Sequence, residues 1–175
     1  YATIQLAIDN AATVSGDVIQ VDAGTFSFGN TVTKSLTIRG ANFGTAGNDI
    51  GRVPESIIDG TDGALDMGFI VSDPSLVVII DGFMFTDCSP VHDNYSATAN
   101  AGTKWTTDVT FTNNIVTSGN ALQCGNIFTF WGTLTVSNNL FTDIDLDANS
   151  SAIVTAQCET AIISDNIFSN INIRF

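Results

Sequence analysis

Cysteine is scarce in this sequence, which has three among 175 residues. Cys88, Cys124 and Cys158 are too few and too far apart for a disulfide scaffold or a zinc site, because both use closely spaced pairs. An odd count leaves at least one free thiol. We expect all three side chains to pack in a core as small apolar groups.

Basic residues are also few: five Lys and Arg stand against eighteen Asp and Glu, giving a formal net charge of −13. Proteins bind nucleic acids and anionic lipids through Lys and Arg, so the charge balance argues against both partners. An acidic polysaccharide would be repelled too, unless Ca²⁺ bridged the two surfaces. Otherwise the acidic surface indicates solubility or adaptation to salt.

Long apolar runs are missing as well. None approaches the roughly 18 residues that a membrane-spanning helix needs, so no membrane insertion is predicted. The hydrophobic content of 44% is too high for a disordered chain, and the length fits one domain over residues 1–175. The chain begins with Tyr1 and no basic and apolar leader, which fits a mature or excised segment.

Short β-rich segments recur along the chain with a shared pattern. Segments 77–85, 109–117, 134–142 and 161–169 align without gaps, while 36–43 and 56–63 fit more loosely. The second residue of each central pair, such as Asp-Gly or Asn-Asn, marks a turn; these residues are Gly40, Gly60, Gly82, Asn114, Asn139 and Asn166. Their spacing of twenty-odd to thirty-odd residues predicts the coils of a β-solenoid, since a propeller blade needs about forty.

Alternation within these segments predicts which side chains point inward, because strand side chains alternate between the two faces. The expected inward sets are Val109, Phe111 and Ile115, then Leu134, Val136 and Leu140, then Ala161, Ile163 and Ile167. We expect each set to stack on the next. Asn114, Asn139 and Asn166 are predicted to form a structural ladder of hydrogen-bonded side-chain amides.

The first residues have a different pattern. Ile4, Ala7, Ile8 and Ala11 recur at helical spacing, and a Ser-Gly-Asp sequence at residues 15–17 ends the pattern. We expect a short helix within residues 1–15 that covers the first coil, followed by about six coils over residues 16–175.

Residues 2–85 contain, in order, ATIQLAIDNAATVSGDVIQVDAGTF, KSLTIRGANFGTAGN, ESIIDG and VVIIDGFMF. This stretch resembles the opening of bacterial secreted and surface β-helix proteins of the pectate-lyase-like superfamily. The resemblance implies an all-β fold, a right-handed single-stranded parallel β-helix with a short N-terminal capping α-helix. It also implies a secreted or cell-surface location. The superfamily includes lyases, esterases, hydrolases, tailspikes and adhesins, so the fold alone does not select an activity.

The residues before the turn marks form one candidate site. With coils about 4.8 Å apart, the carboxylates of Asp59 and Asp81 would lie close together beside Arg39, and would share a proton or bind a cation. In the lyases that the chain resembles, such residues bind Ca²⁺ and a basic residue removes a proton, a role left here to Arg39 or Lys34. The alternative is that Asp-Gly is a plain turn signal at a solvated edge.

Asp143, Asp145 and Asp147 form a second candidate metal site, because they alternate with apolar residues and would place three carboxylates on one side of a strand. They lack the glycine and the closing glutamate of an EF-hand loop. The alternative is a strand whose acidic face lies in water.

A third candidate is the long insertion at residues 88–107. It contains the only histidine, His92, together with Tyr95, Lys104 and Trp105. Aromatic side chains on such insertions are typical stacking surfaces for sugar rings, and a histidine beside an aspartate could serve as a general base. The alternative is a loop without a functional role.

The pattern as a whole favours a non-catalytic extracellular or cell-surface module of the adhesin type that binds a polysaccharide or a cell-surface glycan. One alternative is a lyase or hydrolase that acts on acidic polysaccharide with calcium, although such enzymes need cations along the cleft, which are scarce here. Another is a structural protein that associates end to end. Because the sequence stops nine residues after Asn166, we expect further C-terminal coils or another subunit to complete the last coil.

Overall fold

The computed structural model describes residues 1–60, 67–73, 75–93, 107–117, 130–146 and 157–173. The elements in these ranges are α1 (Ile4–Asp9), β1 (Val18–Gln20), β2 (Gly24–Ser27), β3 (Asn30–Val32), β4 (Leu36–Arg39), β5 (Ser56–Asp59), β6 (Met67–Val71), β7 (Val77–Asp81), β8 (Met84–Thr86), β9 (Ser89–Asp93), β10 (Asp108–Thr112), β11 (Ile115–Thr117), β12 (Phe130–Ser137), β13 (Leu140–Leu146), β14 (Gln157–Ser164) and β15 (Ile167–Ile173). Every strand pair is parallel. The predictions of an all-β chain and of one short helix at its start are confirmed.

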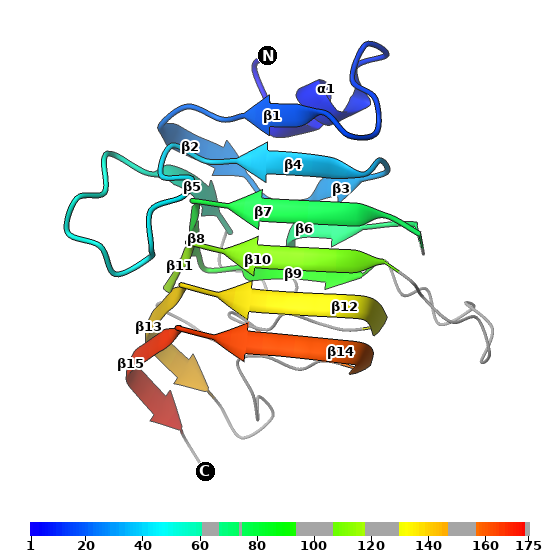
Figure 1. Cartoon of the computed structure of the whole chain (residues 1–175). Coiled ribbons are helices and arrows are strands. Elements are labelled where there is room, and N and C mark those ends of the chain that lie inside the picture. The colour runs from blue at the N-terminus through cyan, green and yellow to red at the C-terminus, as the bar shows by residue number, and fades with distance from the viewer. Residues whose placement is uncertain (61–66, 74, 94–106, 118–129, 147–156, 174–175) are drawn as a thin grey trace.

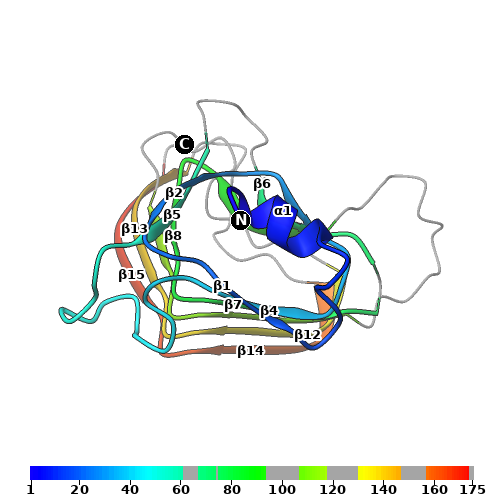
Figure 2. The same ribbon diagram turned by 90° about the horizontal axis from the view of Figure 1, so that it is seen from above.

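The strands form three sheets (Figure 1). Sheet A has the order β1-β4-β7-β10-β12-β14, sheet B has β15-β13-β11-β8-β5-β2, and sheet C has β3-β6-β9. Neighbours in a sheet are never consecutive in sequence, because the chain leaves each sheet, passes through another and returns one strand further along. Seen from above, the sheets surround a common interior, with α1 over one end (Figure 2).

The interior is filled by apolar columns from the inward faces of the sheets. Val109, Phe111, Leu134 and Val136 are all buried and pair in register, as the alternation predicts. In sheet B the buried column is Ile58, Phe85, Val116 and Phe141. The expected inward positions Ile115 and Leu140 are therefore wrong by one residue, and both side chains are only partly buried.

The reason for this error lies at the corner between sheets A and B. Asn113, Asn138 and Asp165 have φ angles of 56–58°, in the left-handed region that asparagine and aspartate tolerate best. One such residue interrupts the period-two alternation, so that Phe111 and Asn114 both face inward. Ile163, which pairs with the buried Val136, is 53% exposed because β14 is the last strand of sheet A.

The predicted asparagine ladder is confirmed. The Oδ1 atom of Asn139 accepts a hydrogen bond from the backbone N–H of Asn114 at 2.9 Å, and Oδ1 of Asn166 accepts one from Asn139 N–H at 3.0 Å. Each Nδ2 atom donates to a carbonyl of an earlier strand, such as Asn139 to Phe111 O at 3.0 Å. These bonds satisfy backbone groups that are buried at the corner, which accounts for the column of asparagines.

Three of the predicted turn marks belong elsewhere. Val109 pairs with Val78 rather than Val77, so Gly82 takes the left-handed position of Asn113 and not the ladder position of Asn114. Gly40 is displaced in the same way, because Arg39 pairs with Asp81. Gly60 follows the last residue of β5 in sheet B, so it does not lie at the corner between sheets A and B where the ladder stands. It is therefore not a mark of sheet A, in which the paired residues Arg39 and Asp81 are 42 residues apart.

Helix α1 begins after Thr3, whose hydroxyl accepts a hydrogen bond from Leu6 N–H, and it ends at Asp9. Its buried face is Ile4, Ala7 and Ile8, whereas Ala11, which the helical spacing also included, lies beyond the helix and is exposed. In the described ranges no helix has the length and apolar content to cross a membrane.

Candidate functional site

The candidate site lies where the strands of sheet A reach the corner with sheet B. Arg39 ends β4 and Asp81 ends β7, and the two residues are paired in register. They are therefore direct neighbours, whereas the sequence placed Asp59 between them. Asp59, which was expected between them, ends β5 of sheet B, so the stacked pair of Asp59 and Asp81 is wrong.

The carboxylate of Asp81 is held by two donors. Its Oδ1 atom accepts from Asn113 Nδ2 at 2.8 Å and from the backbone N–H of Gly44 at 3.0 Å. These contacts join the corner of sheet A to the loop at residues 41–55. Asp81 is thus fixed in position by its surroundings, with a structural reason for its place in the sequence.

Arg39 has fewer partners. Its guanidinium carbon lies 5.0 Å from the ring centroid of Phe43, a cation–π contact, and Phe43 itself is 45% exposed. The buried Nε atom has no hydrogen-bond partner among the described residues. A buried donor without a partner costs stability, so Arg39 is less well satisfied than Asp81.

A row of hydroxyls continues from Asp81 along the outer face of sheet A. Thr112, Ser137 and Ser164 follow it in register on β10, β12 and β14. The hydroxyl oxygens of Thr112 and Ser137 are 3.1 Å apart and share a hydrogen bond. We call Arg39, Asp81, Thr112, Ser137 and Ser164 the outer column. It places one cation, one carboxylate and three hydroxyls in a line, spaced by adjacent strands about 4.8 Å apart.

The 41–55 loop positions Phe43 beside this column. Arg52 is bonded to Glu55 through Nε–Oε1 and Nη2–Oε2, both at 2.8 Å, and its Nη1 donates to Asn113 O at 2.8 Å. The N–H of Gly47 donates to Asn138 O at 2.9 Å. The loop is therefore attached to two successive corners of the stack (Figure 1). Sequence reasoning missed this anchor, although an arginine among glycines was a visible signal.

The other predicted acidic residues are dispersed. The Oδ1 atom of Asp59 accepts from Thr86 Oγ1 at 2.8 Å, within sheet B. Asp143 has a left-handed φ of 56°, is exposed, and accepts from Asn170 Nδ2 at 3.0 Å. It therefore lies at a corner and breaks the alternation assumed for Asp143 and Asp145. Asp145 of β13 pairs with Asn172 of β15. Asp147 lies outside the described residues, so the metal site predicted from the three aspartates stays a prediction.

Part of the predicted long insertion, residues 89–93, forms β9 of sheet C. His92 lies on that strand, in register with Ile70 of β6, and is partly buried. Tyr95, Lys104 and Trp105 lie outside the described residues. Lys34, the alternative base, donates to the carbonyls of Ile8 and Asn10 at the end of α1, at 2.7 and 3.1 Å, so it supports the helix and lies away from the outer column.

Two of the three cysteines can be placed. Cys88 is buried and Cys158 is partly buried against the core, as the prediction of apolar packing requires. Cys124 lies outside the described residues.

The outer column consists of hydrogen-bonding side chains. Arg39 offers it only donors, because a guanidinium has N–H groups and no acceptor. Within the part of the chain that the structure describes, no three acidic, histidine or cysteine side chains gather in a metal-binding group. Searches against family models, curated proteins and solved structures give no match for this chain.

Proposed function

We propose that the chain is a right-handed parallel β-helix of the pectate-lyase-like kind and works as a secreted or cell-surface module that binds carbohydrate without catalysis. The in-register parallel sheets support the fold, and so do the repeated crossovers and the asparagine ladder. Handedness and superfamily rest on the sequence resemblance. The location follows from the same resemblance.

The outer column is the observation that carries the binding proposal. A glycan presents hydroxyl groups that both donate and accept hydrogen bonds, and the column offers a cation, a carboxylate and hydroxyls in one row. The exposed ring of Phe43 lies at the end of this row beside Arg39 and supplies an apolar surface for the C–H face of a sugar ring. The preferred ligand is a neutral polysaccharide or one with few acidic groups, because a net charge of −13 repels polyanions.

Replacing Arg39 by alanine tests this proposal. We expect glycans identified on an array to bind the R39A protein about tenfold more weakly in calorimetry, since hydrogen bonds from a charged donor and the stacking with Phe43 are lost. Thr112→Val should also weaken binding, whereas Thr142→Val should not. The control is well matched, because Thr142 also has a partly buried hydroxyl bonded to its strand neighbour Ser169, at 2.9 Å, but lies on sheet B.

Two results would contradict the proposal. One is that no glycan binds to the unaltered protein. The other is a rise in ultraviolet absorbance when pectate or alginate is added, if Asp81→Ala removes that rise, because this identifies a lyase.

A second candidate function, association of copies end to end, is favoured by an apolar surface on β14 and β15. Four large apolar side chains there are 40–53% exposed: Ile162, Ile163, Ile167 and Phe168. Both strands are outermost in their sheets within the described residues, so their outer edges have backbone groups available for pairing. Light scattering at rising protein concentration should then show species larger than one chain.

Ile163→Asp tests the association. A carboxylate at the open edge would have to be buried between copies, so the variant should remain a single chain at concentrations where the unaltered protein associates. Val77→Asp is the control, because Val77 is 52% exposed but lies on β7, inside sheet A. Equal association of the two variants would reject the end-to-end arrangement, provided that both show the circular dichroism spectrum of the unaltered protein.

A further inference from the structure

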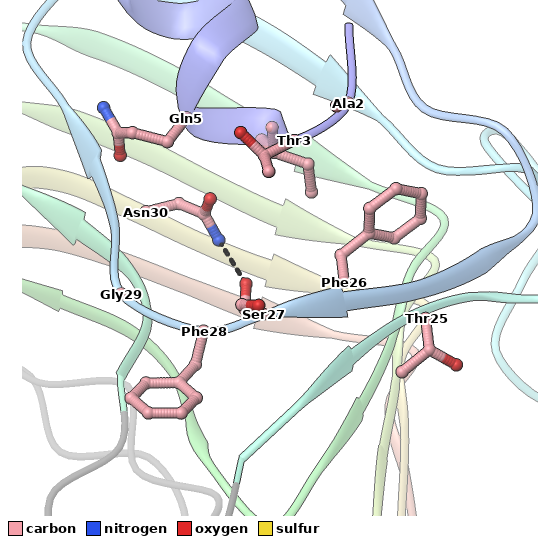
Figure 3. A pocket seen from close by; sticks show the side chains of 10 residues that line it. Ala2, Thr3, Gln5, Thr25, Phe26, Ser27, Phe28, Gly29 and Asn30 are labelled. Carbon is pink, nitrogen blue, oxygen red and sulfur yellow. Dashed lines mark hydrogen bonds between the residues drawn. The ribbon is translucent and has the colours of Figure 1, made fainter.

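A pocket of about 210 Å³ lies between the start of α1 and the chain that leads from β2 into β3. Residues 2–5 form one wall, and residues 25–30 form the other (Figure 3). It is remote from the outer column, since it is built from α1, β2 and β3 and contains no residue of sheet A. Its volume is enough for a handful of water molecules or for one sugar ring.

Asn30 supplies the decisive polar group. The residue is only 4% exposed, and its Nδ2 atom donates to two carbonyls, Ser27 O at 2.9 Å and Gly68 O at 3.2 Å. Because carbonyls can only accept, these contacts fix which end of the carboxamide is nitrogen. The Oδ1 atom therefore faces the other way, toward α1, as Figure 3 shows, and it has no partner among the described residues.

Two other polar side chains of the pocket already have hydrogen-bond partners. Gln5 accepts from Thr31 N–H at 2.6 Å and donates to Asp9 and Thr31 O, which fastens α1 to β3. The hydroxyl of Thr3 accepts from Leu6 N–H as the helix cap. These hydrogen bonds hold the walls in place before any ligand binds. The Oδ1 atom of Asn30 is still without a hydrogen-bond donor, which a ligand could supply.

We propose that this pocket binds a single sugar unit of a glycan, with one hydroxyl donating to Oδ1 of Asn30. The inference rests on the proposed carbohydrate binding and gives it a second site at the helix-covered end of the stack. A hydroxyl fits better than an ammonium group, because Asn30 is uncharged and no carboxylate lines the pocket. The ring of Phe26 belongs to the same wall of the pocket (Figure 3), where it can pack against the apolar face of a sugar ring.

Chemical-shift mapping with simple methyl glycosides tests the site. Methyl glucoside, methyl galactoside and methyl N-acetylglucosaminide would be titrated into the ¹⁵N-labelled protein. We expect one of them to shift the Asn30 side-chain amide and the backbone amides of Gln5 and Gly29, with a dissociation constant on the order of 1 mM. The amides of Thr112 and Ser137 on the outer column should move independently of these.

Ala2→Trp should block the pocket, because Ala2 is exposed and lines its wall, so the protein should fold as before. The shifts at Asn30 should then require at least about tenfold more glycoside. Leu6→Trp is the control, since Leu6 is 54% exposed on the same helix but is not part of the pocket wall.

The outcomes separate this site from the proposed function. Glycoside shifts confined to the outer column, or shifts at Asn30 that Ala2→Trp leaves unchanged, would overturn the pocket and leave the proposed function standing. If glycans bind on an array but no glycoside shifts Asn30, the pocket holds only water and the inference is wrong. If neither an array nor any glycoside shows binding, both proposals fail.

Discussion

Asn139→Ala is expected to lower the free energy of unfolding by about 2–5 kcal/mol, although the residue contacts no ligand. The side chain is 1% exposed, and its removal takes the acceptor from the buried Asn114 N–H and one donor from Phe111 C=O. Each such group costs about 1–3 kcal/mol when it is left unpaired. Urea unfolding followed by circular dichroism measures the change.

The control is Asn48→Ala in the 41–55 loop, where the asparagine is exposed and makes no side-chain hydrogen bond with another described residue. That change should stay within about 0.5 kcal/mol. An equal loss for Asn48 and Asn139 would show that the ladder bonds do not stabilise the stack.

Phe85→Ala is expected to have the second large effect, about 3–5 kcal/mol. Phe85 is fully buried, and its ring centroid lies 5.5–6.1 Å from those of Phe69, Phe83 and Phe111, which come from sheet C, the corner after β7, and sheet A. A cavity at this point removes contacts between all three parts of the interior at once, and the surrounding β-strands cannot collapse to fill it.

Phe85→Leu keeps most of the apolar volume and should recover more than half of the loss, which distinguishes a packing effect from misfolding. Phe43→Ala serves as the surface control, because Phe43 is 45% exposed and should cost much less. A cost for Phe85→Ala below that for Phe43→Ala would contradict the common interior.

The ladder also bears on the proposed binding. Asn113, which precedes the ladder residue Asn114, donates to Asp81, and Asn113 O accepts from Arg52 of the loop that carries Phe43. The residues of the outer column are therefore held by the same corner that the asparagines stabilise. Less conformational entropy is lost on binding when the contacting side chains are already held in place. The proposed binding therefore depends on the same corner that stabilises the fold.

The sequence predicted the stacking well where the segments share the same corner. The pairing of Leu134 with Val109 on one side and with Ala161 on the other follows from the aligned Asn-Asn and Asp-Asn pairs, and the structure has that register. The segment at 77–85 was placed one residue off. Its Asp-Gly pair resembles the asparagine pair in a sequence, but Gly82 occupies the left-handed position and not the ladder position.

The acidic column was misplaced for a related reason. Asp59-Gly60 and Asp81-Gly82 look alike, yet Asp59 ends a strand of sheet B and Asp81 ends one of sheet A. A short β segment followed by Asp-Gly does not reveal which sheet it joins, because any strand of such a stack can end in a turn. The number of residues between successive corners would have shown which sheet the segment joins, but that number changes with the length of each loop.

The pocket at the helix-covered end had no signal in the sequence at all. Asn30 stands in no repeat, and its free Oδ1 atom depends on two carbonyls, one of them at Gly68, far along the chain. Contacts of this kind arise from the fold and not from a local pattern. The short helix itself was predictable, because Ile4, Ala7 and Ile8 share one face and Thr3 caps its first turn.

The central claim is that parallel strands from successive coils lie in register around one apolar interior. Nuclear Overhauser contacts in the labelled protein test it most directly. We predict cross-peaks from the ring of Phe111 to the methyl groups of Val136, and from the Asn139 side-chain amide to the amide proton of Asn114. If Phe111 and Val136 show no contact while both resonances are assigned, the stack and the outer column built on it are contradicted.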